Sequence, residues 1–448
     1  MKKKTIINRL FIISVSLLTA GVIVLSCAKT QHFKLSQFIS PDTCGGCHSE
    51  IYEQWLNSMH NTAHKDPLYV QVSHFLRKGL TNGDEIKEAE SCVKCHTPVG
   101  VVSGYPTKVS DDRSKVAEIA REGIQCDYCH SAVSAKKMYN NGLVLSPGNG
   151  MEDPGTKRGP FKDSKSDFHK SAYSEFHTGS EICGTCHNVK HVVFDTVLES
   201  TYDEWKNGPY NSKDPAKRIT CQGCHMYQRP GIAATGSTER PANPGKAADD
   251  GPERKHIFTH YFVGGNSLVP GKMGDEAKNK MALERLQNAA VLEIDAKKAA
   301  SGEIEVIVKN TGAGHFLPTG LTDTRQMWLE IEVKDSRNRI VYSSGKVGPR
   351  GYLADTTIMY NTIFGDGKGN RVINIAKARE ILRDRRIPPQ SSLKEKIKFS
   401  AKGSKSISVS VKLLYRIAPQ KIVDTVLGTG KLKIPVVKMA EVKKQITL

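Results

Sequence analysis

The sequence lacks a hydrophobic run long enough to cross a membrane comfortably, and it lacks the ligand spacing of an EF-hand calcium loop. Its main apolar stretch, from Leu10 to Leu25, has 16 residues, whereas a membrane-spanning helix needs roughly 20. The glycine-rich segment that begins at Phe364 carries acidic residues at unsuitable intervals for calcium, so we interpret it as a hairpin turn. Acidic residues are also few, 46 against 65 lysines and arginines. These absences argue against an ordinary membrane span and an EF-hand protein.

The N-terminus has the pattern of an export signal. It begins with Met1 and three lysines, continues with the apolar stretch and reaches a small-residue boundary at Cys27. The residues Val24-Leu25-Ser26-Cys27 resemble a bacterial lipobox, in which Cys27 becomes the lipidated N-terminus. We therefore predict a lipoprotein-type signal peptide over residues 1–26 and an exported protein in the periplasm or outer membrane, with the cell surface as an alternative. An uncleaved anchor and a signal that merely contains a cysteine stay open.

The cysteines do not suit a disulfide framework. An exported chain with 11 cysteines would normally suggest one. Ten of them, however, form five pairs with two intervening residues, each pair followed directly by a histidine, and the eleventh is Cys27. The five motifs are Cys44, Cys47 and His48; Cys92, Cys95 and His96; Cys126, Cys129 and His130; Cys183, Cys186 and His187; and Cys221, Cys224 and His225.

Five such motifs predict five covalently attached haem c groups. Two thiols separated by two residues can add to the two vinyl groups of one porphyrin, and the histidine that follows lies under the iron as its proximal ligand. Paired cysteines also build zinc sites and thioredoxin-like redox sites. Five pairs that all end in histidine disfavour zinc, and no recurrent βαβ pattern surrounds them to support a thioredoxin-like role.

The region that carries the motifs is short for five cofactors. Only 182 residues run from Cys44 to His225, too few for a separate protein core around each haem. We therefore expect the porphyrins themselves to form the core, wrapped by short helices such as residues 49–60 and 115–122. Haems packed so densely lie close enough to exchange electrons, which makes electron transfer the expected function.

The excess of positive charge does not indicate a nucleic-acid partner. The formal net charge is +19, and it falls to +15 when Lys2, Lys3, Lys4 and Arg9 leave with the predicted signal. The negative charges of the haem propionates would offset much of the remaining positive charge. A modestly basic surface favours acidic redox partners or anionic membrane. The expected partners are other redox proteins, namely cytochromes or quinol-linked donors, and the membrane through a lipid anchor at Cys27.

Ten histidines lie outside the motifs, and five would suffice to complete five irons. They are His32, His60, His64, His74, His169, His177, His191, His256, His260 and His315. His60 follows His48 by 12 residues on a predicted helix, which is about 18 Å along its axis. It cannot ligate the haem that His48 holds, so we expect it to ligate a neighbouring one.

Seven stretches resemble the cytochrome c-554 family of multihaem cytochromes. They are "CGGCHSEIYEQWLNSMHNTAHKDPLY", "EGIQCDYCH", "FHKSAYSEFHTGSEICGTCHNV", "STYDEWKNGPY", "CQGCHM", "HIFTHYFVGGN" and "NTGAGHFLPTGLTDTRQMWLEIEV". The resemblance implies bis-histidine haems that transfer electrons. The histidines inside these stretches that we predict as distal iron ligands are His60, His169, His177, His260 and His315, with a surface or hydrogen-bonding role as the alternative for each.

The other histidines are less suited to ligation. His64, His191 and His256 are reserve candidates, whereas His32 and His74 suit surface positions. Met226 directly follows a proximal histidine and cannot reach the opposite face of the same porphyrin.

The second half of the chain has no haem motif. Residues 226–255 are rich in glycine, proline and charge, which predicts a long excursion or linker. A helical run from 275 to about 290 leads into alternating segments with β-branched residues, which predict an antiparallel β-sandwich. The predicted strands cover residues 303–309, 327–334, 339–343, 393–399, 407–415 and 422–427.

The expected fold class is α+β multidomain, with a mostly helical and loop-rich pentahaem cytochrome domain followed by an antiparallel β-sandwich domain. We assign residues 27–270 to the pentahaem domain, 271–300 to a linker helix and 301–448 to the sandwich. His315 lies in the turn GAGHFLPTG between two predicted strands, where a loop can project a ligand into the neighbouring domain. An iron bond would then clamp the domains, and a loop histidine without metal is the alternative.

Two functions compete. The first is a non-catalytic electron carrier in which every iron has six ligands, and the second is an oxidoreductase for nitrite or hydroxylamine in which one iron stays open. Pentahaem nitrite reductases replace one proximal histidine by lysine, whereas all five motifs here end in histidine. We therefore favour the carrier, although some relatives of the cytochrome c-554 type keep one five-coordinate haem. A structural or adhesion lipoprotein is a third interpretation.

Overall fold

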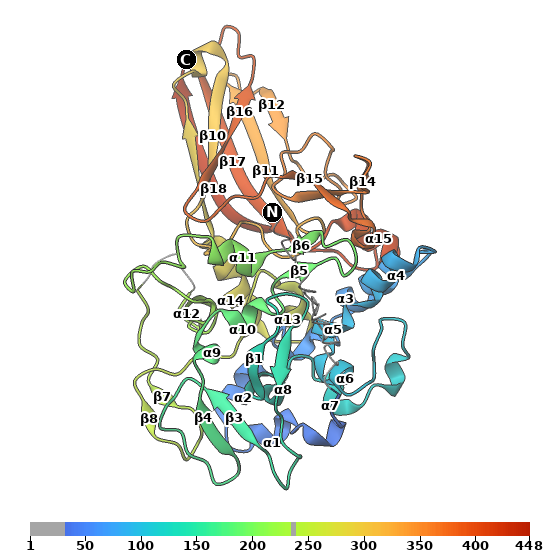
Figure 1. Cartoon of the computed structure of the whole chain (residues 1–448). Coiled ribbons are helices and arrows are strands. Elements are labelled where there is room, and N and C mark those ends of the chain that lie inside the picture. Colours follow the sequence, from blue (N-terminus) through green and yellow to red (C-terminus); the bar gives the residue numbers. More distant parts are fainter. Residues whose placement is uncertain (1–31, 234–238) are drawn as a thin grey trace, which may run out of the picture. The chain divides into compact units, whose positions relative to one another are not determined.

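Short helices joined by loops make up the first part of the computed structural model, which describes residues 32–233 and 239–448 (Figure 1). The predicted signal peptide and Cys27 lie outside the described residues. No helix in the described ranges is both long and apolar enough to cross a membrane. The α-helices up to His225 are α1 Pro41–Gly45, α2 Ser49–Trp55, α3 Pro67–Arg77, α4 Gly83–Glu90, α5 Val93–His96, α6 Pro98–Val102, α7 Glu118–Arg121, α8 Cys126–His130, α9 Glu175–Thr178, α10 Glu181–Gly184, α11 Thr201–Lys206 and α12 Cys221–His225.

Small strand pairs lie between these helices. They are β1 Ala132–Ala135 with β2 Leu143–Leu145, β3 Thr156–Gly159 with β4 Lys170–Tyr173, β5 Val189–Lys190 with β6 Val197–Glu199, and β7 Gly245–Lys246 with β8 Glu253–Arg254. The β3–β4 pair is parallel and the other three are antiparallel. Pairs this short hold loops in place but do not form a core of their own.

Capping side chains determine where several helices begin. The Ser40 hydroxyl accepts from a backbone N–H of α1, and Pro41 occupies the first position of that helix. Asp66 and Asn82 each accept from two backbone N–H groups at the starts of α3 and α4. These caps give the short helices defined start points in a region with little regular structure.

The helices predicted over residues 49–60 and 115–122 are both interrupted. Helix α2 ends at Trp55 because Leu56 leaves the helical conformation and Asn57 has a left-handed φ of 58°. In the second segment, extended Val116 separates a 3-10 turn from α7. The prediction of one continuous helix was therefore wrong in each case, and the axial distance deduced for His60 does not apply.

Helices α13 Leu268–Lys272 and α14 Glu276–Gln287 lead into two antiparallel sheets. One sheet has the order β16-β10-β9 and the other the order β12-β11-β17-β18. In the first sheet β10 pairs with β16, and in the second β17 pairs with both β11 and β18 (Figure 1). The strands are β9 Ala290–Asp295, β10 Glu303–Asn310, β11 Gln326–Asp335, β12 Ile340–Ser344, β16 Ser392–Lys398, β17 Ser406–Arg416 and β18 Val437–Thr447. This arrangement confirms the antiparallel sandwich and the α+β class.

The two sheets share one hydrophobic core. Alternate residues of β10 are buried, among them Ile304, Val306 and Val308, and they pack in the same cluster as Leu329 and Val409 of the other sheet. Alternation of this kind places one face of each sheet inward. The sandwich is therefore held together by ordinary apolar packing.

One predicted strand of the sandwich was wrong. Residues 422–427 belong to helix α15 Gln420–Leu427, which starts after Pro419. Its inward residues Val423 and Leu427 are four positions apart, the spacing of a helix face. The strands β9 and β18 were not predicted, and neither was a third sheet of β14 Arg371–Val372, β13 Thr362–Gly365 and β15 Glu380–Asp384. The hairpin turn predicted at Phe364 is confirmed by the β13–β14 pairing.

The helical part and the sheets contact each other. Residues 32–448 form one compact unit, and a hydrophobic cluster joins Leu76 and Ala89 of the helical part to Phe364 and Ala376 near the third sheet. The Asn374 side chain also donates to the carbonyl of Leu76 (2.8 Å). The domain boundaries at 270/271 and 300/301 stay a prediction.

Candidate haem-binding sites

Each Cys-x-x-Cys-His motif lies on or beside a single helical turn. The N–H of His48 donates to the carbonyl of Cys44 at 2.9 Å, and the same bond recurs between His187 and Cys183. Helices α5, α8 and α12 contain the proximal histidines of the other three motifs. A turn of this kind places the two cysteines and the histidine on one side of the backbone, where one porphyrin could engage all three.

The Nδ1 atom of every proximal histidine faces an acceptor. The partners are the carbonyls of Ala247 for His48 (2.5 Å), Ala63 for His96 (2.9 Å), Arg158 for His130 (2.6 Å) and Val263 for His225 (3.1 Å), and the Glu199 carboxylate for His187 (3.6 Å). An imidazole that donates through Nδ1 presents the lone pair of Nε2, and metal-bound histidines are usually oriented in this way. The surroundings of all five rings therefore fit iron ligation.

Four proximal histidines stand opposite a second histidine. The ring centres are 6.4 Å apart in His48/His169, 6.3 Å in His187/His60, 6.4 Å in His130/His260 and 6.4 Å in His225/His315. An imidazole nitrogen binds a metal at about 2 Å and the ring centre lies about 1 Å behind it, so two rings on opposite sides of one ion stand about 6 Å apart. These separations fit one iron between the rings of each pair.

His130 has a second histidine nearby. The ring centre of His177 lies 5.7 Å from that of His130. Both nitrogens of His177 are already engaged, since Nδ1 contacts the Ser174 hydroxyl (2.9 Å) and Nε2 contacts the carbonyl of Cys129 (3.0 Å). In this conformation His177 has no free nitrogen to offer a metal.

The surroundings of His96 differ from those of the other four. Its ring is stacked face to face on Tyr69 of α3, with the ring centres 3.7 Å apart and an interplanar angle of 3°. This separation leaves no room for an iron between the two rings. The reserve candidate His64 is buried close by, and its Nδ1 contacts the hydroxyl of Thr97, the residue after His96 (2.7 Å).

Burial keeps the predicted distal histidines neutral. It lowers the pKa of both His60 and His260 to about 3 and that of His177 to about 4, and it lowers the pKa of His169 and His315 as well. The cause is the loss of solvent around a charged imidazolium. Only the neutral ring has the lone pair that a metal requires.

Cysteines of different motifs meet in space. The side chains of Cys44 and Cys126 lie close enough to shift each other's pKa, and so do those of Cys95 and Cys186 and those of Cys183 and Cys221. None of the ten described cysteines forms a disulfide. Attachment points that are far apart in the sequence therefore lie close together in space.

The remaining histidines have other surroundings. His191 is buried, and both of its nitrogens are engaged by backbone groups of Val193, Phe194 and Ala376. His256 is stacked on Tyr227 with ring centres 4.1 Å apart, and His32 and His74 are exposed.

Sequence reasoning did not single out Tyr69, Glu199 or the carbonyls that face the proximal rings. A carbonyl has no sequence signal, because every residue carries one. Glu199 could have been considered, since it stands 12 residues after His187, just before the stretch STYDEWKNGPY.

Comparisons with known proteins agree with these motifs. Residues 43–131 match the family described as cytochrome c554 and c-prime. The crystal structure of a penta-heme cytochrome c552 from Thermochromatium tepidum has a similar fold, with a TM-score of 0.60 and 18% sequence identity, covering 92% of this chain and 100% of that chain. At this identity the likeness shows the fold alone. A search of curated proteins found no match.

The motifs, the fold and the family match define a multihaem c-type cytochrome. Within this class, the part of the chain that matches the family described as cytochrome c554 and c-prime is residues 43–131. Haem c as cofactor and electron transfer as function are what this class of protein implies for the chain.

Proposed function

We propose that this chain is an electron carrier with five haem c groups, at least four of which have two histidine ligands. The observation that carries the proposal is the separation of 6.3–6.4 Å in four histidine pairs. Haem iron supplies the one-electron redox chemistry when it is bound. The protein's part is to hold each ring by its Nδ1 partner and to exclude water around it.

The assignment of ligands follows from the pairs. We assign His169 opposite His48, His60 opposite His187, His260 opposite His130 and His315 opposite His225. His177 is the competing ligand for His130, but its engaged nitrogens favour His260.

The cysteine contacts support an order for the haems. Cys44 meets Cys126, so the first and third attachment points adjoin. Cys129 of the third motif interacts electrostatically with Cys186 of the fourth. Cys183 of the fourth meets Cys221 of the fifth. We infer a path through haems one, three, four and five.

The second haem forms a side branch of this path. Its residue Cys95 contacts Cys186 of the fourth motif. The branch therefore joins the main path at the fourth haem, which has neighbours on three sides.

An oxidoreductase is the second candidate, and the contact between Tyr69 and His96 favours it. Tyr69 is stacked on the face of the His96 ring. The second haem therefore lacks the opposed histidine ring that the other four sites have. His64 is then the alternative sixth ligand. With His64 bound the protein is a carrier, and with that position open a small nitrogen compound such as nitrite or hydroxylamine could bind.

We further propose that the protein is exported and anchored through a lipidated Cys27, in the periplasm or outer membrane, and that its partners are other redox proteins. The N-terminal sequence pattern and the basic composition support this part of the proposal.

Mass spectrometry of the mature protein tests the haem count and the anchor. We expect five haems bound through thioethers and a diacylglyceryl group on Cys27. Free thiols at Cys92 and Cys95, or zinc in their place, would contradict the haem assignment. A mature chain that starts at another residue would contradict only the assignment of a lipid anchor at Cys27.

Near-infrared magnetic circular dichroism, which counts high-spin irons, separates the two functions. A carrier should show five low-spin ferric haems, and His64→Ala should convert one of them to high spin. One high-spin haem in the unaltered protein, together with turnover of nitrite or hydroxylamine, would favour the oxidoreductase.

A further inference from the structure

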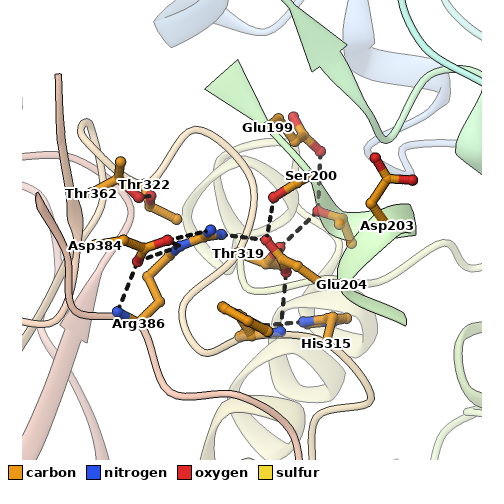
Figure 2. A network of polar contacts seen from close by, with 12 residues as sticks. Glu199, Ser200, Asp203, Glu204, His315, Thr319, Thr322, Thr362, Asp384 and Arg386 are labelled. Carbon is orange, nitrogen blue, oxygen red and sulfur yellow. Dashed lines mark hydrogen bonds and ion pairs between the residues drawn. The ribbon is translucent and has the colours of Figure 1, made fainter. Parts of the chain in front are cut away.

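A buried carboxylate lies beside the loop that carries His315. Glu204 of α11 has a side chain that is only 4% exposed. It accepts hydrogen bonds from the Ser200 hydroxyl (2.8 Å), the Phe316 N–H (3.0 Å) and the Thr319 hydroxyl (2.7 Å), and it pairs with the guanidinium of Arg386 (Figure 2). Four donors saturate the two oxygens of a carboxylate.

Two of these donors fix the backbone next to His315. The N–H of Phe316 belongs to the residue that directly follows the histidine, and Thr319 lies four positions after it. On the other side of the turn, the Asn310 amide donates to the carbonyl of His315 (2.9 Å). The peptide groups around His315 are therefore held from the helical part by Glu204 and from the sandwich by Asn310.

The charge of Glu204 is balanced within the same cluster. Arg386 is 8% exposed on its side chain, and it also donates to the Asp384 carboxylate (2.8 Å). Burying an ion pair costs desolvation energy that well-packed apolar residues would avoid, so such a pair contributes little net stability. A geometric role explains its presence better than a stabilising one.

The cluster also extends to the fourth motif. The Thr319 hydroxyl oxygen lies 2.7 Å from that of Thr201, and the Thr201 hydroxyl oxygen lies 3.3 Å from the Glu199 carboxylate. Glu199 in turn is the carboxylate that faces Nδ1 of His187. One continuous set of polar contacts thus links the support of His187 to the support of His315.

We propose that Glu204 is a positioning residue that holds His315 opposite His225 and so determines how firmly the fifth haem keeps its sixth ligand. The inference rests on the proposed function, because it requires His315 to be an iron ligand. Glu204 acts through the Phe316 N–H and does not touch the reacting atoms. Its negative charge also favours the ferric over the ferrous state of the nearby haem.

The experiment uses the full-length protein with its haems and measures two properties of each haem: the midpoint potential, and the affinity of the ferric iron for cyanide. Glu204→Gln keeps the size of the side chain but removes the charge and half of its acceptor capacity. Thr319→Val removes one donor and is the milder second variant. Asp335→Asn is the control, since Asp335 is a buried carboxylate that also accepts from an arginine and from backbone N–H groups, but in the β11–β12 hairpin.

In Glu204→Gln, one more haem should bind cyanide than in the unaltered protein. The affinity of that haem for cyanide should rise about 10- to 100-fold, because a metal ligand that loses its supporting hydrogen bond usually binds the metal more weakly by that factor. The midpoint potential of the same haem should rise. Thr319→Val should change the same haem by a smaller factor, and Asp335→Asn should change none. His315→Ala identifies the haem concerned.

The outcomes separate the inference from the proposed function. If His315→Ala alters one haem while Glu204→Gln and Thr319→Val leave that haem unchanged, Glu204 is not a positioning residue and the ligand assignment stands. If His315→Ala alters no haem, the ligand assignment itself is wrong and the inference fails with it. Equal changes at all five haems in Glu204→Gln would indicate general destabilisation and would also overturn the inference.

Discussion

Asp323 is a half-buried acid that should weaken the fold at neutral pH. It lies between the turn that carries His315 and strand β11, its Oδ1 atom has no hydrogen-bond partner in the described structure, and burial raises its pKa from 3.8 to about 7. Folding therefore keeps the carboxyl protonated at a pH where the unfolded chain would ionise it. Each pKa unit corresponds to about 1.4 kcal/mol, so the shift destabilises the folded state by up to about 4 kcal/mol above pH 7.

The sign of the pH dependence follows from proton uptake. Between pH 4 and 7 the folded protein binds more protons at Asp323 than the unfolded chain does, so this residue makes stability fall as the pH rises. Below pH 3.8 both states are protonated and the penalty vanishes. Asp323→Asn, which stays neutral, should raise the free energy of unfolding by about 2–4 kcal/mol at pH 8 and by little at pH 4.

Chemical denaturation followed by far-UV circular dichroism at both pH values measures this difference. Asp335→Asn serves as the control, because the Arg339 N–H lowers the pKa of Asp335, and its loss should therefore cost nearly the same stability at pH 8 as at pH 4, both of which lie above the unfolded pKa of 3.8. The reasoning would be refuted if Asp323→Asn destabilised the protein at pH 8 or changed stability equally at both pH values.

Two further predictions concern the distal ligands. His260→Met should keep the haem count and raise the midpoint potential of one haem, because Met/His ligation gives a higher potential than bis-histidine ligation. A redox titration of the variant that matched the unaltered protein at every haem would exclude His260 as an iron ligand. Gly123→Ala should alter the haem that His187 holds, because Gly123 has φ +61° and a Cβ there would lie 2.2 Å from the carbonyl oxygen of His60. Gly79→Ala is the matched control, with φ +73° and nothing within 4 Å of the added carbon. Equal haem spectra for the two variants would show that Gly123 does not help to place His60.

The features that could be predicted from the sequence are those with local causes. The attachment motifs are complete within five residues, so their helical turns follow directly. Most sandwich strands were also predictable, since alternation in segments such as β10 and β17 reflects burial on one face. Helix α14 begins after its N-cap residue Asp275, where the helical run was predicted to start.

Other features depend on contacts across the chain. The apolar residues around Val423 suit a strand or a helix, and the core that Val423 joins selects the helix. Nothing local shows that His60 faces His187 or that Ala247 faces His48. Helix α2 ends at Trp55 through the backbone conformation of Asn57, which many sequences of similar composition would not adopt.

The distance along the chain between the two histidines of each pair has a consequence for how the protein is made. The partners are separated by between 90 and 130 residues, and the carbonyl that orients His48 follows it by 199 residues. A ribosome synthesises the chain from its N-terminus, so in three of the four pairs the proximal histidine is made well before its partner, whereas His60 is made before His187. A nascent chain that has reached Met226 already holds all five attachment motifs but has neither His260 nor His315. With the proposed ligand pairs, completion of the sites of His130 and His225 therefore depends on residues that are made after all five motifs.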